Sequence, residues 1–182
     1  MCILCYYRQR RFIRQKRFIL KEEENVKETS NWLGQWEIEI RENGKVKEIV
    51  SLKHNLITDA GLNMFRDALK GDITDMQIKY VVLGNDATAP ANADTQLVAE
   101  QFRKVVTSAN VDPVTAGKLY TELYIADTEA NTFKAEEIGW FAGVGATATV
   151  NTGILIARVL YSRQKASTES WTIRRTDQLS RG

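Results

Sequence analysis

The sequence predicts a mainly β protein: an antiparallel β-sandwich with one main α-helix and a basic N-terminal extension. Seven or eight short segments between residues 36 and 173 alternate apolar and polar side chains with a period of two, as half-buried strands do. Only one segment, 59–70, has a firm helical pattern. We therefore divide the chain into a basic arm and linker (1–34), a sandwich domain (35–176) and a C-terminal tail (177–182).

Positive charge is concentrated in the first 21 residues. This segment contains seven cations and no acid, which leaves a net charge of −5 for the remainder of a chain whose total is +2. The seven cations, which we take as the residues of an assembly arm, are Arg8, Arg10, Arg11, Arg14, Lys16, Arg17 and Lys21. Such a segment suits docking on an acidic neighbouring chain, on nucleic acid or on an anionic membrane surface. It also fits an extension without a folded role.

Cysteine and histidine are scarce. Cys2 and Cys5 form the only Cys-x-x-Cys pair, and His54 is the only histidine. A structural zinc site needs four such ligands, and a redox-active pair needs further support in the sequence. We therefore expect no metal and no cofactor, and a sandwich domain that is stable without disulfides.

The sandwich domain is predicted to open with a β-hairpin. Residues 36–40 alternate Trp and Ile with charged side chains, which is the pattern of a half-buried strand. Asn43-Gly44 then supplies the positive φ angles of a type I′ turn. The return strand is expected to continue as far as Leu52.

The helix 59–70 carries signals at both ends. Thr58 can cap its first turn, and Gly71 can close it in the left-handed conformation. Its predicted buried face consists of Leu62, Phe65 and Leu69. At about three turns, the helix should lie across a sheet or close one end of the sandwich.

The rest of the domain is predicted to consist of strands and loops. Further strands are expected at 76–82, 119–125, 136–141, 154–161 and 171–173, with an ambiguous stretch at 97–108. Two long segments of small residues, 84–95 and 142–153, are expected to form loops. Long loops of this kind are usually functional or disordered.

No catalytic motif accompanies this pattern. His54 is the only candidate base, and the sequence has neither a Gly-x-Ser-x-Gly elbow nor a phosphate-binding glycine motif. Glu136 and Glu137 are adjacent in a predicted strand, so they face opposite sides and cannot act as a catalytic pair. We therefore expect a protein that is not an enzyme.

Two pairs of charged residues interrupt the predicted strands. The residues concerned are Glu100, Arg103, Glu137 and Arg158. Buried charges usually persist only when they are paired, and such a pair fixes strand register more than it adds stability. We predict that Glu137 and Arg158 pair with each other or with Arg103 and Glu100, in a structural role.

The aromatic residues leave a second functional class open. Trp32, Trp36, Trp140 and Trp171, together with six tyrosines, can include a stacking platform for a sugar ring. Most of them fall in phase with aliphatic neighbours, which favours a place in the core. A carbohydrate-binding module for cell-surface recognition is therefore the alternative function.

Several weak motifs follow one another in a fixed order across residues 36–173. After the tryptophan-bearing hairpin come NLITDAGLNMFRDALKG (55–71), IKYVVLGNDATAPANADTQLVAEQFR (78–103), EEIGWF (136–141), ILIAR (154–158), Lys165 and a final Trp-x-Ile strand. In this order and spacing the chain resembles structural proteins of tailed-phage particles, of the tail-fibre, baseplate or neck-collar type. The resemblance implies a β-sandwich virion component without catalysis, and it does not extend to the basic arm.

The leading expectation is thus a structural component of a tailed-bacteriophage particle, placed in the tail, baseplate or neck region. Its expected partners are other copies of itself and other phage structural proteins, and no small-molecule substrate is expected. Assembly would take place in the host cytoplasm, and the mature location would be the virion.

Overall fold

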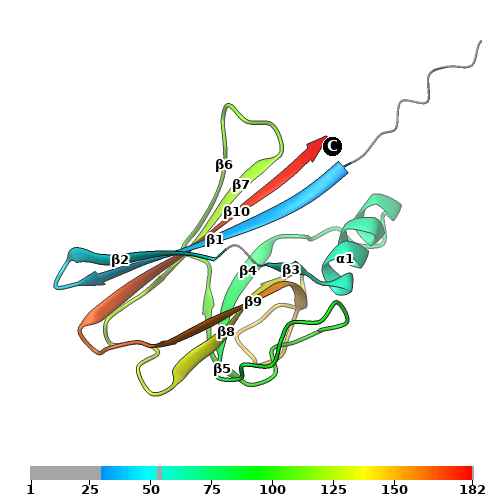
Figure 1. Cartoon of the computed structure of the whole chain (residues 1–182). Helices are drawn as coiled ribbons and strands as arrows, with labels where there is room; N and C mark the ends of the chain where they lie inside the picture. The colour runs from blue at the N-terminus through cyan, green and yellow to red at the C-terminus, as the bar shows by residue number, and fades with distance from the viewer. Residues whose placement is uncertain (1–29, 53–54, 182) are drawn as a thin grey trace, which may run out of the picture.

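A computed structural model describes residues 30–52 and 55–181, which form ten β-strands and one α-helix (Figure 1). The basic arm and His54 lie outside the described residues. In chain order the elements are β1 (Ser30–Glu42), β2 (Lys45–Leu52), β3 (Leu56–Ile57), α1 (Asp59–Lys70), β4 (Ile78–Gly84), β5 (Glu100–Val105), β6 (Ser108–Val111), β7 (Lys118–Ile125), β8 (Lys134–Ala142), β9 (Ile154–Gln164) and β10 (Glu169–Arg181).

The strands form two five-stranded antiparallel sheets, as expected for a β-sandwich. Sheet A has the order β2-β1-β10-β7-β6, and sheet B has the order β3-β9-β8-β4-β5. The fold class predicted from the sequence is therefore confirmed. The expected number of strands was too low because it did not include the two-residue β3 or β6. The ambiguous stretch 97–108 contains all of β5, in sheet B, and the first residue of β6, in sheet A. The chain crosses from one sheet to the other between Val105 and Ser108.

The outer boundaries of the domain differ from the predicted ones. β1 and β10 pair along their full lengths, from Ser30 opposite Arg181 to Glu42 opposite Glu169. The expected linker therefore ends before Ser30, and residues 177–181 belong to β10 and not to a tail. The sequence hid this continuation because the last strand residues are mostly polar, and backbone pairing with β1 holds them in place.

The β1–β2 hairpin forms as predicted. Asn43 and Gly44 have φ angles of 50° and 78°, which a two-residue turn of this kind requires. The ladder shifts register between Ile40 and Arg41. β2 is an edge strand, and its apolar residues Val46 and Ile49 remain exposed.

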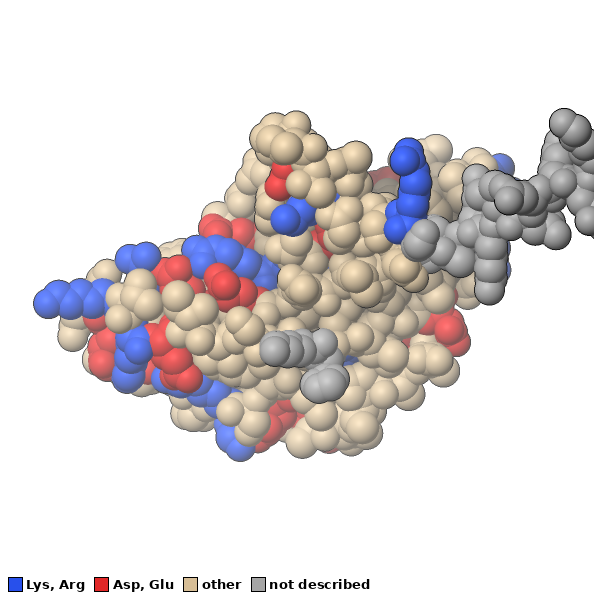
Figure 2. All heavy atoms as spheres, turned by 45° about the horizontal axis from the view of Figure 1, so that its top comes forward, with Lys and Arg blue, Asp and Glu red and all other residues tan. Residues whose placement is uncertain are grey.

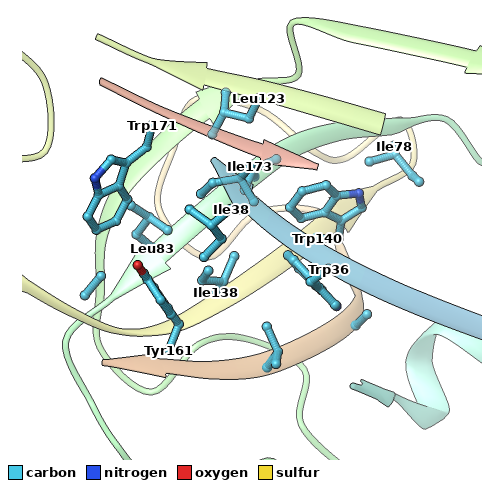
Figure 3. Packing of buried hydrophobic residues seen from close by; sticks show 14 of the residues in the cluster. Trp36, Ile38, Ile78, Leu83, Leu123, Ile138, Trp140, Tyr161, Trp171 and Ile173 are labelled. Atoms are coloured by element: carbon cyan, nitrogen blue, oxygen red, sulfur yellow. The ribbon is translucent and has the colours of Figure 1, made fainter. Parts of the chain in front are cut away.

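The core lies between the two sheets and is built from their inward-facing side chains (Figure 3). Trp36 of β1 meets Trp140 of β8 edge to face, with ring centroids 4.3 Å apart. Tyr161 and Trp171 make a second such contact at 5.6 Å. Aromatic pairs in this geometry stabilise a core beyond the area they bury. Three of the four tryptophans are thus in the core, so they are not available as sugar-stacking platforms.

Helix α1 begins and ends where the sequence predicts. The Thr58 side chain accepts a hydrogen bond from the N–H of Gly61, and Gly71 closes the helix with a φ of 88°. The predicted buried face is wrong, however. Leu62, Phe65 and Leu69 are 51%, 40% and 76% exposed.

Close contact with β9 explains the orientation of α1. The buried residues of the helix are Gly61 and Met64. A Cβ atom on Gly61 would lie 2.8 Å from the carbonyl oxygen of Ile156, so only glycine lets the helix approach the strand this closely. The helix therefore turns its narrow Gly61–Met64 stripe inward and leaves its larger apolar side chains outside.

Glu169 joins three strands at the other end of the sandwich and makes stability depend on pH. Its burial alone raises the pKa of the carboxyl, but hydrogen bonds from Lys47 of β2, the Ala166 N–H, Trp171 of β10 and Arg163 of β9 together lower that pKa from 4.5 to about 2. A carboxyl whose pKa is lower in the folded than in the unfolded protein stabilises the fold at pH values above its unfolded pKa. This stabilisation is lost as the pH falls through the folded pKa. We expect the free energy of unfolding to fall between about pH 4.5 and pH 2.

The matching variant is Glu169→Gln, which cannot titrate. Chemical denaturation at a series of pH values should show a shallower fall for this variant over the same window. Equal slopes for the two proteins would show that Glu169 does not carry the pH dependence.

Candidate binding surfaces

Glu137 of β8 and Arg158 of β9 pair with each other, and both side chains are fully buried. Arg158 Nε donates to Glu137 Oε2 at 2.8 Å, Nη1 donates to Asp94 at 2.7 Å, and Nη2 donates to the carbonyl of Thr88 at 2.8 Å. Glu137 also accepts hydrogen bonds from the backbone N–H groups of residues 98 and 99. The pair therefore fastens the loop 85–99 against the outer face of sheet B.

Glu100 and Arg103 form a second, separate pair. Arg103 Nε and Nη2 donate to the two carboxylate oxygens of Glu100 at 2.7 and 2.8 Å, and the guanidinium lies 4.4 Å from the Phe141 ring centroid. Arg103 Nη1 also donates to the carbonyl of Thr152 at 3.0 Å. This pair fastens the loop 143–153, which corresponds to the predicted loop 142–153. Each of the two predicted loops is thus held against sheet B by one ion pair. Both pairs contact loop residues, which is a structural role.

A third buried pair escaped sequence reasoning. Arg175 is fully buried, and its Nε and Nη2 donate to Asp177 at 2.7–3.0 Å. Burial lowers the pKa of Arg175, while Asp177 opposes that effect. The guanidinium lies over the Trp36 ring, and Trp32 Nε1 donates to Asp177 Oδ1 at 2.7 Å. The sequence does contain a signal for this pair. Residues 175 and 177 continue the period-two alternation of Trp171 and Ile173, which places them on the same buried face of the strand.

An apolar groove of about 290 Å³ opens where the ends of sheet A face α1 and sheet B. Its lining side chains are mostly apolar: Trp32, Met64, Phe65, Met76, Ile78, Ala109, Leu119, Ile156 and Leu179, with Gly117 and the polar Gln77 and Asp177. Figure 1 shows α1 beside the ends of β1 and β10, where the described chain begins and ends. We call this surface the apolar groove.

The exposed stripe of α1 extends the apolar groove. Phe65 lines the groove itself. Leu62 lies about one helical turn before Phe65, and Leu69 lies about one turn after it. Leu179, on the opposite wall, is 46% exposed. Large apolar side chains gathered around one groove are typical of an interaction surface, whereas single ones scattered over a surface are not.

A larger, polar groove of about 770 Å³ lies on the outer face of sheet A. Two rows of outward-facing side chains cross the sheet there. The first row is Ser51, Glu37, Arg174, Glu122 and Ser108, one residue from each of the five strands. The second row is Gln35, Thr176, Tyr120 and Asn110. We call this surface the polar groove.

Charge around the polar groove is arranged about Arg174. Its Nε donates to Glu122 at 2.9 Å, and its Nη1 donates to Glu37 at 3.2 Å and Glu39 at 2.9 Å. The bond from Arg174 and a second from Arg41 lower the pKa of Glu39, and the carboxylates together raise the pKa of Arg174 against the effect of burial. Figure 2 shows charged side chains of both signs gathered toward the end of the molecule that carries β2.

Within residues 30–52 and 55–181 no helix is long and apolar enough to cross a membrane. The same residues contain no group of three or more His, Cys, Asp or Glu side chains placed to hold a metal ion. No family model matches the sequence, and searches of curated proteins and of solved structures return no significant match.

Proposed function

We propose that the protein is a structural component of a tailed-bacteriophage particle, in the tail, baseplate or neck region. It acts by multimeric assembly with other copies and other virion proteins, and has no catalytic step of its own. The observation that carries this proposal is the apolar groove together with the exposed apolar stripe of α1. The motif order along residues 36–173, which resembles such particle proteins, supplies the biological setting.

The apolar groove favours assembly because its exposure is costly in a lone molecule. Burying a Leu or Phe side chain contributes about 1.5–3 kcal/mol relative to leaving it exposed. α1 leaves three such residues exposed, Leu62, Phe65 and Leu69. A partner that covers Leu62, Phe65 and Leu179 therefore gains a large part of its binding energy from one small area.

The occupant we assign to the groove is the N-terminal segment, residues 1–29, of a neighbouring copy. This segment offers Phe18-Ile19-Leu20 directly before Lys21, so an apolar triplet is flanked by the cations of the arm. Its first 21 residues carry +7, whereas the remainder of the chain carries −5, so opposite charges assist the encounter between copies.

The length of chain before β1 allows a neighbour as the acceptor. β1 starts at Ser30, at the end of sheet A, and Trp32 already lines the apolar groove. The ten or so residues between the apolar triplet and Ser30 span roughly 33 Å when extended. The segment thus starts from the rim of one groove with enough length to enter the groove of an adjacent copy. Such head-to-tail contacts close into rings when the rotation between copies allows it.

A charge placed in the groove should abolish association. We expect the full chain to form concentration-dependent oligomers in sedimentation velocity, and Phe65→Glu to remain monomeric because a carboxylate cannot be buried unpaired in an apolar groove. Phe18→Asp in the arm should have the same effect. Ile49→Glu is the matched control, because Ile49 is similarly exposed (55%) but lies on β2, away from the groove.

Two results would contradict the proposal. Oligomers that persist in both Phe65→Glu and Phe18→Asp would show that the groove and the arm do not meet. Absence of the protein from purified phage particles, measured by mass spectrometry, would remove the virion assignment even if the oligomers form.

A further inference from the structure

The polar groove has features that assembly through the apolar groove does not use. It lies on the outer face of sheet A, and all nine outward-facing side chains of its two rows are exposed or half-buried. Its volume of about 770 Å³ falls within the range of sites that hold small molecules or oligomers. We propose that the polar groove binds a neutral, hydroxyl-rich oligosaccharide.

The groove is wide enough for several sugar rings in a row. Its first row of side chains crosses all five strands of the sheet, from Ser51 on β2 to Ser108 on β6. Neighbouring strands lie about 4.8 Å apart, so four strand spacings give a length of roughly 19 Å. A single ring or a small metabolite would leave most of this length empty.

The floor of the groove holds hydrogen-bonding groups in fixed positions. Arg174 binds one oxygen of Glu37 and one of Glu122. The other oxygen of each carboxylate accepts no hydrogen bond from any described residue, and the two side chains are 45% and 34% exposed. Each is therefore an oriented acceptor for a hydroxyl group of a ligand. Gln35 and Asn110 add amides, which both donate and accept.

The charge of the floor selects against other ligand classes. Among the described residues that line the groove, Arg174 is the one outward-facing cation, and it is already paired with acids on both sides, so the floor has little attraction for a phosphate or a carboxylate ligand. Hydroxyl groups, which donate to carboxylates and accept from amides, match this lining.

Tyr120 provides an aromatic ring in the second row. Its hydroxyl donates to Asp112 Oδ2 at 2.6 Å, and Lys118 Nζ lies 5.1 Å from the ring centroid. The bond from Tyr120, together with the N–H groups of Thr115 and Val114, holds the pKa of Asp112 well below its usual value, so the carboxylate stays ionised as the acceptor. The ring therefore has a fixed orientation beside the polar floor, which suits stacking against the C–H face of a sugar.

The test uses the full chain on an array of neutral oligosaccharides, followed by calorimetric titration with the glycan that binds best. We expect a defined neutral glycan to bind. Tyr120→Ala should weaken its affinity by roughly tenfold or more, the scale on which a single good contact acts. Tyr124→Ala is the matched control: Tyr124 is exposed on the same face of the same strand but does not line the groove.

Two further variants separate binding from folding. Tyr120→Phe keeps the ring and should retain most of the affinity even if Tyr120→Ala unfolds. Asn110→Ala, an exposed change at the groove, should also weaken binding while leaving the melting temperature in place. No binding on the array, binding only to anionic glycans, or equal weakening by Tyr124→Ala would each overturn the proposal. Sedimentation of Tyr120→Ala should match the original protein, so failure here leaves the assembly test unaffected.

Discussion

Replacing Arg158 with alanine is expected to lower the free energy of unfolding by about 3–5 kcal/mol. The change removes the guanidinium from a fully buried pair and leaves the carboxyl of Glu137 buried without its cation. It also releases Asp94 and the Thr88 carbonyl, so the loop 85–99 loses two of its attachments to sheet B. Urea denaturation followed by tryptophan fluorescence measures the loss, because the core tryptophans report on both sheets.

Two comparisons make this result specific to the buried pair. Arg66→Ala removes an exposed ion pair with Asp67 on α1 and should change stability by less than about 1 kcal/mol. The double variant Glu137→Ala/Arg158→Ala should lose less than the sum of its two single variants, because neither charge is then left alone. If Arg158→Ala unfolds at the same urea concentration as the original protein, the pair does not hold the loop as described.

Trp36→Ala is expected to be as damaging, with a loss of about 3–5 kcal/mol. Trp36 is 1% exposed, meets Trp140 across the core and lies beneath the guanidinium of Arg175. Its Nε1 also donates to Asn55 at 2.9 Å. The substitution thus opens a cavity between the sheets and removes one partner of a buried cation.

Graded substitutions test this account of Trp36. Trp36→Phe keeps a ring against Trp140 but loses the bond to Asn55, so it should cost clearly less than Trp36→Ala. Leu33→Ala, three residues earlier on the same strand, removes a side chain that is 58% exposed and should change stability by no more than about 0.5 kcal/mol. Similar losses for Leu33→Ala and Trp36→Ala would mean that Trp36 is not part of the core.

The features that were predicted from sequence are those that depend on neighbours along the chain. The Asn43-Gly44 turn and the Thr58 and Gly71 ends of α1 follow from local backbone preferences, and the structure confirms them. The alternation of apolar residues likewise identified most strands of both sheets, but not the short β3 and β6. Charged residues within apolar strands, such as Glu137 and Arg158, need a partner of opposite charge. Few such partners lie in the predicted strands, so the pairing could be predicted.

The features that were missed depend on contacts between distant segments. The buried face of α1 is set by the approach of Gly61 to the backbone of β9, which no helical periodicity reveals. Both grooves have the same origin. The polar groove exists because β10 lies between β1 and β7, which brings Glu37, Arg174 and Glu122 into one row from positions far apart in the sequence.

The central position of β10 also affects how the protein is made. The last strand of the described chain lies in the middle of sheet A, so β1 has no partner on one side until the ribosome has added residues 169–181. At roughly 5–20 residues per second, several seconds separate the synthesis of these two strands. During that time the β1–β2 hairpin and the β6–β7 pair are two unjoined halves, each with an open edge that can pair with another nascent chain. Sheet A is therefore completed only after β10 has been synthesised, although both halves of the sheet are made earlier.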